Sequence, residues 1–277
     1  MKADCHMHMI LDGDDWRASI YRHSQAPDKP YIRRILRQYQ QLGYTYLRDG
    51  GDRWGAGAMA RSLAPEYGIT YRTPLAPLCL EGHYGGFIGI HYNNVKEYAR
   101  LVLRQKQAGA DFIKIMISGL MDFNHYGVLT EPGLEPALIR ELIHIAHEEG
   151  MPVMAHANGA RTVETAADAG VDSVEHGAYL DEDALAAMAE RGTVWVPTLS
   201  AIGNLRGKGR FSESAVQKIL ESALENISSY RGLLAAGTDA GAWAVPHGSG
   251  TEEGLFALAG VSEDRLTEGT AVIIQKF

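Results

Sequence analysis

The sequence predicts an α/β fold, specifically a (β/α)8 TIM barrel, and three observations lead to this prediction. Short apolar runs rich in β-branched residues alternate with helix-length segments along the chain. We count eight such runs, the number of parallel strands in this kind of barrel. Several helical segments stop at a glycine directly before the next run: Gly43, Gly68, Gly109, Gly150, Gly170 and Gly192. A single barrel domain over residues 1–277 is therefore expected.

Each predicted element follows from its apolar pattern. We expect strands at Ala3–Met9, Tyr44–Asp49, Thr70–Leu75, Phe112–Ile117, Pro152–His156, Ser173–His176, Val194–Leu199 and Leu234–Thr238. Apolar residues spaced by three and four indicate helices at Tyr31–Leu42, Ala56–Glu66, Val95–Ala108, Leu134–Glu149, Ala160–Ala169, Glu182–Arg191 and Glu213–Leu233. The segments Thr251–Gly260 and Val261–Thr270 would together supply the eighth helix.

Composition and charge exclude several classes of partner. The formal net charge of −8 leaves no broad basic field for nucleic acid or an anionic membrane. Cys5 and Cys79 are too few for a disulfide framework, and we expect buried thiols. No apolar run approaches membrane-spanning length, and Lys2 is followed by Asp4 and His6 without the apolar region of a signal peptide. We therefore expect a cytoplasmic protein.

Residues of the types that bind metal ions recur at the ends of the predicted strands. His6 and His8 lie on the same face of a strand because side chains alternate with period two, although His-x-His alone is a weak signal. The other residues of this kind are Lys114, His156, His176 and Asp239. Because a barrel brings the carboxyl ends of its strands to one mouth, we expect these six side chains to converge. Lys114 lies among Phe, Ile and Met, where an unpaired ammonium would be costly to bury.

Seven phrases, taken together, resemble the metal-dependent amidohydrolase superfamily, and its prolidase-like branch of Xaa-Pro and Xaa-Arg/Lys dipeptidases in particular. They are Asp4-Cys5-His6-Met7-His8, Leu47-Arg48-Asp49-Gly50-Gly51, Ala110-Asp111-Phe112-Ile113-Lys114-Ile115-Met116, Val153-Met154-Ala155-His156, Val174-Glu175-His176-Gly177, Val196-Pro197-Thr198-Leu199 and Gly237-Thr238-Asp239-Ala240-Gly241. The resemblance implies two divalent ions, usually zinc, with His6, His8 and Asp239 on one and His156 and His176 on the other. A carboxylated Lys114 would bridge them.

The resemblance also implies a mechanism. A water between the two ions would lose its proton near neutral pH and become the nucleophile, and Asp239 would move that proton to the leaving amine. Family members usually add a small β-sandwich from segments flanking the barrel. Only five residues precede His6 and the chain stops soon after the eighth predicted helix, so we expect either a barrel-only member or a trimmed chain. The deaminase branch pairs its fifth-strand histidine with a glutamate three residues on. Gly159 occupies that position here, which disfavours deamination.

Loops after the predicted strands offer further candidates. The glycine-rich Glu81–Gly86 loop carries His83 and could cover the site. Tyr126 could donate to a developing oxyanion, and its neighbour His125 would face the substrate. His247 follows the eighth strand at the same mouth, and each of these residues could equally be an ordinary packing or surface residue. Arg48 and Asp49 are expected to form a structural pair.

A carboxylate on the substrate would need a cation in the pocket. Arg161, after the fifth strand, and the basic run Arg206–Arg210, after the seventh, are the available choices. The expected function is hydrolysis of C–N amide bonds in dipeptides or N-acyl amino acids. Lactone or phosphoester hydrolysis on the same metal core, and a non-catalytic barrel that binds a small ligand, are the alternatives. The expected partner is a small-molecule substrate, and assembly into a homo-oligomer is left open.

Overall fold

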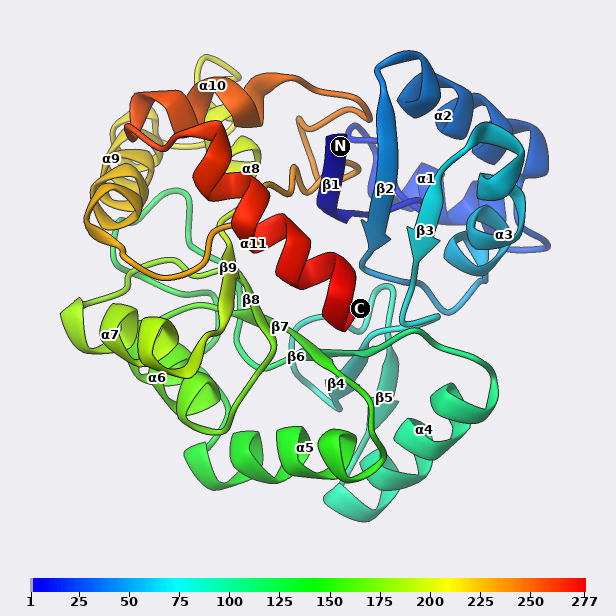
Figure 1. The fold of residues 1–277 in the computed structure, drawn as a ribbon, viewed down its shortest axis with the longest axis horizontal. Coiled ribbons are helices and arrows are strands. Elements are labelled where there is room, and N and C mark those ends of the chain that lie inside the picture. Colours follow the sequence, from blue (N-terminus) through cyan, green and yellow to red (C-terminus); the bar gives the residue numbers. More distant parts are fainter. Residues whose placement is uncertain (1) are drawn as a thin grey trace.

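The computed structural model describes residues 2–277 and consists of two parallel sheets with helices packed around them (Figure 1). The first sheet has the order β1-β2-β3, formed by Lys2–Met7, Tyr44–Asp49 and Thr70–Arg72. The second has the order β5-β4-β6-β7-β8-β9. Its strands, in chain order from β4, are Leu78–Leu80, Ile90–Tyr92, Ile113–Met116, Val153–Ala157, Ser173–His176 and Val194–Val196. Parallel strands separated by helices confirm the predicted α/β class.

The helices follow the strands in the expected alternation. In chain order they are α1 (Trp16–His23), α2 (Lys29–Gln41), α3 (Ala56–Leu63), the 3-10 turn η1 (Ala64–Tyr67), α4 (Val95–Gln107), α5 (Pro136–Glu148), α6 (Ala160–Asp168), α7 (Glu182–Arg191), α8 (Ser200–Gly203), α9 (Glu213–Ser229), α10 (Thr251–Leu258) and α11 (Glu263–Lys276). In Figure 1, α11 runs across the strands in the middle of the view, and it contacts β1 and β9. Phe277, just beyond α11, is buried with Cys5 and Phe112 in one core cluster.

The segment between α9 and α10 links the two sheets through backbone hydrogen bonds. Trp195 N donates to Leu233 O and Ala235 N to Trp195 O, at 2.9 and 3.0 Å. On the other side, Cys5 N donates to Ala236 O at 2.9 Å. A Cβ at Gly237 would lie 2.8 Å from His6 N, so only glycine allows so close an approach to β1.

The strand predicted at Leu234–Thr238 is not formed as a continuous strand. This segment forms isolated bridges, Trp195 with Leu234 and Met7 with Ala240, rather than a continuous ladder. The helix predicted over Glu213–Leu233 ends at Ser229 because Tyr230 adopts extended backbone angles. The strands β4 and β5 and the helices α1 and α8 were not expected from the sequence. β4 and β5 contain three residues each, too few for an alternating pattern.

The remaining strand predictions agree with the structure to within a few residues, and those for β2 and β8 have the observed bounds. Across residues 2–277, no helix combines the length and apolar character needed to cross a membrane.

Candidate active site

Six side chains of metal-ligand type line one cavity of about 650 Å³. They are His6, His8, Lys114, His156, His176 and Asp239. His6, His156 and His176 lie in the carboxyl-terminal halves of β1, β7 and β8, and His8 lies just beyond β1. Lys114 is the second residue of β6, and Asp239 precedes Ala240, which bridges to β1. All six are at least nine-tenths buried. The convergence expected from parallel strand ends is therefore present in the structure.

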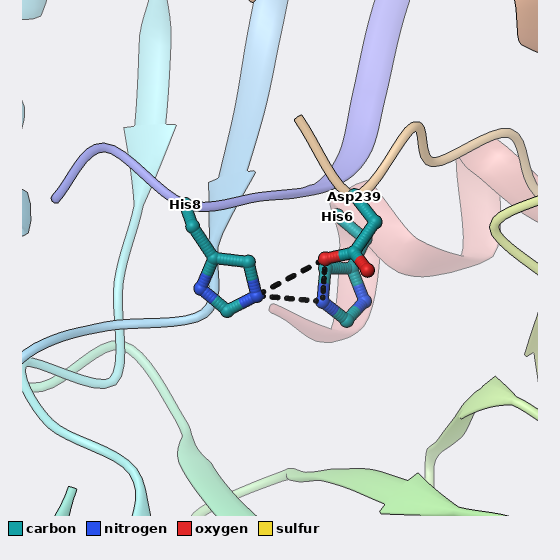
Figure 2. Close-up of side chains that lie close together, drawn as sticks. All are labelled: His6, His8 and Asp239. Atoms are coloured by element: carbon teal, nitrogen blue, oxygen red, sulfur yellow. Dashed lines mark hydrogen bonds and ion pairs between the residues drawn. The ribbon is translucent and has the colours of Figure 1, made fainter. Parts of the chain in front are cut away.

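His6, His8 and Asp239 form the tightest group, and Figure 2 shows their ligand atoms pointing toward one another. The Nε2 atoms of the two histidines are 3.2 Å apart. Asp239 Oδ1 lies 3.5 Å from His6 Nε2 and 3.2 Å from His8 Nε2. Two imidazole nitrogens and a carboxylate oxygen in this arrangement could hold one divalent ion.

The His8 ring also depends on a close approach to the backbone. A Cβ at Gly50 would overlap His8 Cε1. Gly50 follows β2 directly, so its lack of a side chain leaves the space in which the imidazole lies. A side chain at position 50 would therefore displace the His8 ring.

Hydrogen bonds on the far side of the His6 ring fix its tautomer. His6 Nδ1 donates to Glu175 Oε2 at 2.7 Å. Arg48 Nη2 donates to Glu175 Oε1 at 2.8 Å, so the carboxylate is held from its other side. Because Nδ1 carries the proton, the lone pair of His6 Nε2 is free to face His8 and Asp239. The expected pairing of Arg48 with Asp49 is wrong, since Arg48 pairs with Glu175.

His156 and His176 form a second pair next to the first. Their ring centroids are 4.5 Å apart, and those of His6 and His176 are 5.1 Å apart. His156 Nε2 is 3.2 Å from Gly119 O, an acceptor, so the proton lies on Nε2 and the lone pair on Nδ1. Burial lowers the pKa of His156 to about 3 and holds that of His176 well below its ordinary value. Both rings are therefore neutral, as metal ligation requires.

Lys114 is the least satisfied group of the site. Within residues 2–277, its Nζ is buried without a hydrogen-bond partner. Burial lowers the pKa of this amine to about 8, so the uncharged form is more accessible near neutral pH than in an exposed lysine. An orphaned amine among four imidazoles and a carboxylate fits the metal centre that the sequence implied, because reaction with CO₂ would turn it into an anionic ligand.

Strained backbone fixes the positions of two residues of the cavity, His176 and Asp239. His176 and Asp239 have φ angles of 70° and 57°, in the left-handed region that side chains other than glycine rarely adopt. Thr198, whose Oγ1 lies 2.7 Å from His176 Nδ1, has a φ of 49°. Asp4 accepts hydrogen bonds from Thr238 N and Thr238 Oγ1, at 2.9 and 2.6 Å, and so fixes the residue before Asp239. Such strain is typical of functional sites.

Three predicted catalytic or substrate residues lie away from this cavity. His83 Nδ1 is 3.5 Å from Glu131 Oε2. Tyr126 is 48% exposed and packs edge-on against Tyr179. His125 is exposed and bonds to Asp122 at 2.7 Å. Of the residues that the structure describes, these three do not line the cavity, and their roles stay predictions.

The other three predicted substrate-binding residues, Arg161, Arg206 and His247, also lie outside the cavity lining. Arg161 is exposed near the start of α6. Arg206 Nε donates to Gly203 O, at 3.3 Å, beside the end of α8. His247 is buried and its Nε2 donates to Leu11 O at 2.9 Å, which indicates a packing role. None of these three lines the cavity in the described part of the chain.

Tyr84 and Arg210 line the cavity. Tyr84 was not predicted from the sequence, and Arg210 was included only as part of the basic run Arg206–Arg210. The Tyr84 ring lies 4.8 Å from that of His156, and Tyr84 N donates to Glu131 Oε2 at 2.9 Å. The available signals were the neighbouring His83 for Tyr84 and the basic run Arg206–Arg210 for Arg210. Neither signal tells which member of a loop faces inward.

Comparison with known proteins places these residues in a family context. The model of the amidohydrolase family matches residues 21–263. Ochratoxinase from Aspergillus niger is 27% identical over 274 residues, covering 84% of this chain and 55% of its own. The chain thus spans about half the length of this curated relative.

Solved structures share the fold. A Xaa-Pro dipeptidase with methionine bound in its active site superposes with a TM-score of 0.77 at 22% identity, covering 99% of this chain and 75% of its own. The structure of Aspergillus niger ochratoxinase gives a TM-score of 0.72 at 24% identity, covering 98% and 68% of the two chains.

Proposed function

This chain belongs to the amidohydrolase family, and from that premise we propose that it is a binuclear metal-dependent hydrolase of C–N amide bonds. The substrates would be small, such as dipeptides or N-acyl amino acids. One observation carries the proposal: the His6–His8–Asp239 group adjoins the His156–His176 pair in the cavity that Lys114 also lines.

The chain's own residues would hold two divalent ions. His6, His8 and Asp239 would bind one, and His156 and His176 the other, with zinc suited to imidazole and carboxylate donors. The neutral amine of Lys114 would attack the carbon of CO₂, forming an N–C bond while one C=O π bond breaks and the nitrogen releases a proton, and the resulting carbamate would help to hold the ions. When bound, the ions would acidify a water and polarise the scissile carbonyl.

Asp239 would carry the proton through the reaction. Its carboxylate lies beside both first-strand histidines, within reach of a water held there. It would accept the proton of the attacking water and deliver it to the leaving nitrogen, so that the amine departs neutral. The left-handed backbone at Asp239 and the two hydrogen bonds from Thr238 to Asp4 would hold that geometry.

The relatives support amide hydrolysis as the reaction. A Xaa-Pro dipeptidase, by its name, acts on dipeptides, and its structure contains methionine in the active site. Ochratoxinase, the curated relative, is named for a different substrate. We propose that this chain hydrolyses an amide bond in a substrate that its own cavity selects.

We also propose that the two sheets are parts of one (β/α)8 barrel forming a single domain over residues 1–277. The segment around Leu234–Ala240 supports this proposal because it bonds to β9 on one side and to β1 on the other. The buried thiols of Cys5 and Cys79 are compatible with a reducing cytoplasm, where we propose the enzyme acts on a small-molecule substrate.

A substrate screen of the zinc-loaded protein tests the proposed function. The panel would contain dipeptides, N-acyl amino acids, lactones and phosphoesters, each assayed for product release. We expect turnover of the amides, abolished in the His6→Ala variant. Turnover confined to lactones or phosphoesters would replace the proposed substrate class, and a folded, metal-free protein with full activity would refute the metal mechanism.

A further inference from the structure

Arg210 has no part in the proposed metal chemistry, yet it lines the same cavity as the site. Its guanidinium carbon lies 4.4 Å from the ring centroid of Trp243 and 5.3 Å from that of Phe211. Both rings also line the cavity. In the part of the chain that the structure describes, the guanidinium has no carboxylate or hydrogen-bond partner, so its N–H groups remain available.

The charge distribution of the cavity makes Arg210 distinctive. Among the described lining residues, Arg210 and Lys114 are the only lysine or arginine. Lys114 would become an anionic carbamate in the proposed enzyme, which leaves Arg210 as the one permanently cationic side chain. A substrate carboxylate lying away from the two ions would otherwise meet the carboxylates of Asp14 and Asp122 without compensation.

The loop that carries Arg210 is tied to its surroundings at three points. Gly207 N donates to Glu213 Oε1 at 3.0 Å, and Ser212 N donates to Asn124 Oδ1 at 3.1 Å. Asn204 Nδ2 donates to Ala244 O, next to Trp243, at 3.0 Å. These bonds join the loop to the segments carrying Asn124 and Trp243, which also line the cavity. The arginine is therefore positioned before any ligand arrives, which reduces the entropic cost of binding.

A second set of aromatic rings gives the cavity an apolar wall that reaches the metal-ligand residues. Trp16 lies 5.5 Å from Phe87, Phe87 lies 5.9 Å from Tyr84, and Tyr84 lies 4.8 Å from His156, measured between ring centroids. A row of aromatic rings that ends at His156 suits a substrate with an aromatic or large aliphatic group near its scissile bond.

We propose that Arg210, held on Trp243 and Phe211, binds a carboxylate of the substrate and that the substrate is an N-acyl amino acid with a large apolar group. The inference rests on the proposed amide hydrolysis for the identity of the substrate. Arginine suits the role because its planar fork can donate to both carboxylate oxygens while its face remains stacked on an aromatic ring. The structure thereby selects Arg210 over Arg161 and Arg206.

Binding of a matched ligand pair tests this proposal without requiring turnover. N-(phenylsulfonyl)-L-phenylalanine contains no amide carbonyl to attack, and N-(phenylsulfonyl)phenethylamine lacks only its carboxylate. Calorimetric titration of the zinc-loaded protein should give a Kd about tenfold lower, or better, for the first ligand. In Arg210→Met, which keeps an apolar stem over Trp243, the two ligands should bind within about twofold of each other, the gain from the charged hydrogen bonds being lost.

Arg206→Met is the matched control because it removes a neighbouring positive charge outside the cavity lining. It should keep the wild-type preference for the carboxylate. Equal loss in both variants would indicate a diffuse field and overturn the assignment, as would equal affinity of the wild type for both ligands or failure to bind either. Carboxylate-dependent binding in a protein that hydrolyses no amide would leave Arg210 as the anion site and refute only the proposed reaction.

Discussion

Glu175 Oε2 accepts a hydrogen bond of 2.7 Å from His6 Nδ1, and both side chains are fully buried. Arg48 donates to the other carboxylate oxygen from β2, so three strands cooperate in orienting one imidazole. A metal-ligating histidine usually has such a partner on its second nitrogen, because the partner fixes the tautomer and the ring orientation. Glu175 therefore acts on the site through His6.

Glu175→Gln should weaken metal binding. Arg48 can only donate, so the amide oxygen of the glutamine would face Arg48 and its NH₂ group would face His6 Nδ1. The proton of His6 would then move to Nε2 and block the ligand position. We expect zinc affinity, measured against a competing chelator, to fall about 10- to 100-fold.

Ser173→Ala is the control for that variant. Its hydroxyl bonds to Arg48 and Glu175 but not to His6, so metal affinity should change much less. Thermal unfolding would show whether both variants remain folded at the assay temperature. Equal zinc affinity in Glu175→Gln and the wild type would contradict the proposed tautomer.

The six ligand-type residues could be placed from the sequence because their positions follow from regular structure. Parallel strands bring their carboxyl ends together, so His156 and His176 had to lie near His6 once the strands were assigned. Glu175 was not predicted as the partner of His6, because regular strand alternation would turn it away from the face that carries His176. The left-handed φ of 70° at His176 breaks that alternation, and both side chains lie next to His6.

Loop residues could not be placed in the same way. His83 and Tyr84 are adjacent, and only the tertiary fold determines that Tyr84 faces His156. Arg206 and Arg210 belong to one basic run, but hydrogen bonds from Asn204 and Ser212 to distant segments decide which arginine reaches the cavity. Such contacts leave no periodic pattern in the sequence.

Asp239→Asn should reduce turnover far more than substrate affinity. Asparagine tolerates the left-handed φ of 57° at this position, so the backbone should be preserved. It cannot accept and return a proton, and we expect kcat to fall about 10²- to 10⁴-fold with a smaller change in KM. Steady-state kinetics at saturating zinc on the best amide of the screen measures both.

Asp122→Asn provides a matched comparison, since Asp122 also lines the cavity but bonds to His125 at its rim. Its kcat should remain close to that of the wild type. If Asp239→Asn kept wild-type turnover with zinc bound, proton transfer would have to be assigned to another group.

Glu252 should make the stability of the fold depend on pH. It is buried and accepts hydrogen bonds from Leu199 N and Ser200 N, at 2.9 and 2.6 Å, where α8 begins. Burial outweighs these bonds and raises the pKa of its carboxyl from 4.5 to about 8. Between those values the folded protein keeps a proton that the unfolded chain has lost, so the free energy of unfolding should decrease as pH rises.

Urea unfolding of the wild type and Glu252→Gln at pH 5.5 and pH 8.5, chosen to span most of that range, tests this prediction. Glutamine cannot titrate, so the decrease should be smaller in the variant. Other buried acids, including Asp49 with its pKa raised to about 6, titrate in both proteins, and the difference between the two isolates Glu252. The same pH dependence in both would show that Glu252 is ionised in the folded protein throughout the range.

Lys114 should carry a carbamate in the zinc-loaded protein. Its Nζ is buried without a partner among residues 2–277, a position that disfavours the ammonium, and the two bound ions would compensate the negative charge of a carbamate. Protein loaded with zinc in ¹³C-bicarbonate should show a protein-bound ¹³C carbamate signal by NMR, and elemental analysis should give about two zinc ions per chain, as expected when the carbamate completes both ligand sets.

Lys114→Ala should lose the signal, most of the metal and the activity, with partial recovery in acetate, whose two oxygens can replace those of the carbamate. Lys106→Ala, which removes a surface lysine paired with Glu149, should keep all three. A fully zinc-loaded, active wild type without the ¹³C signal would mean that Lys114 binds the ions, if at all, as a plain amine.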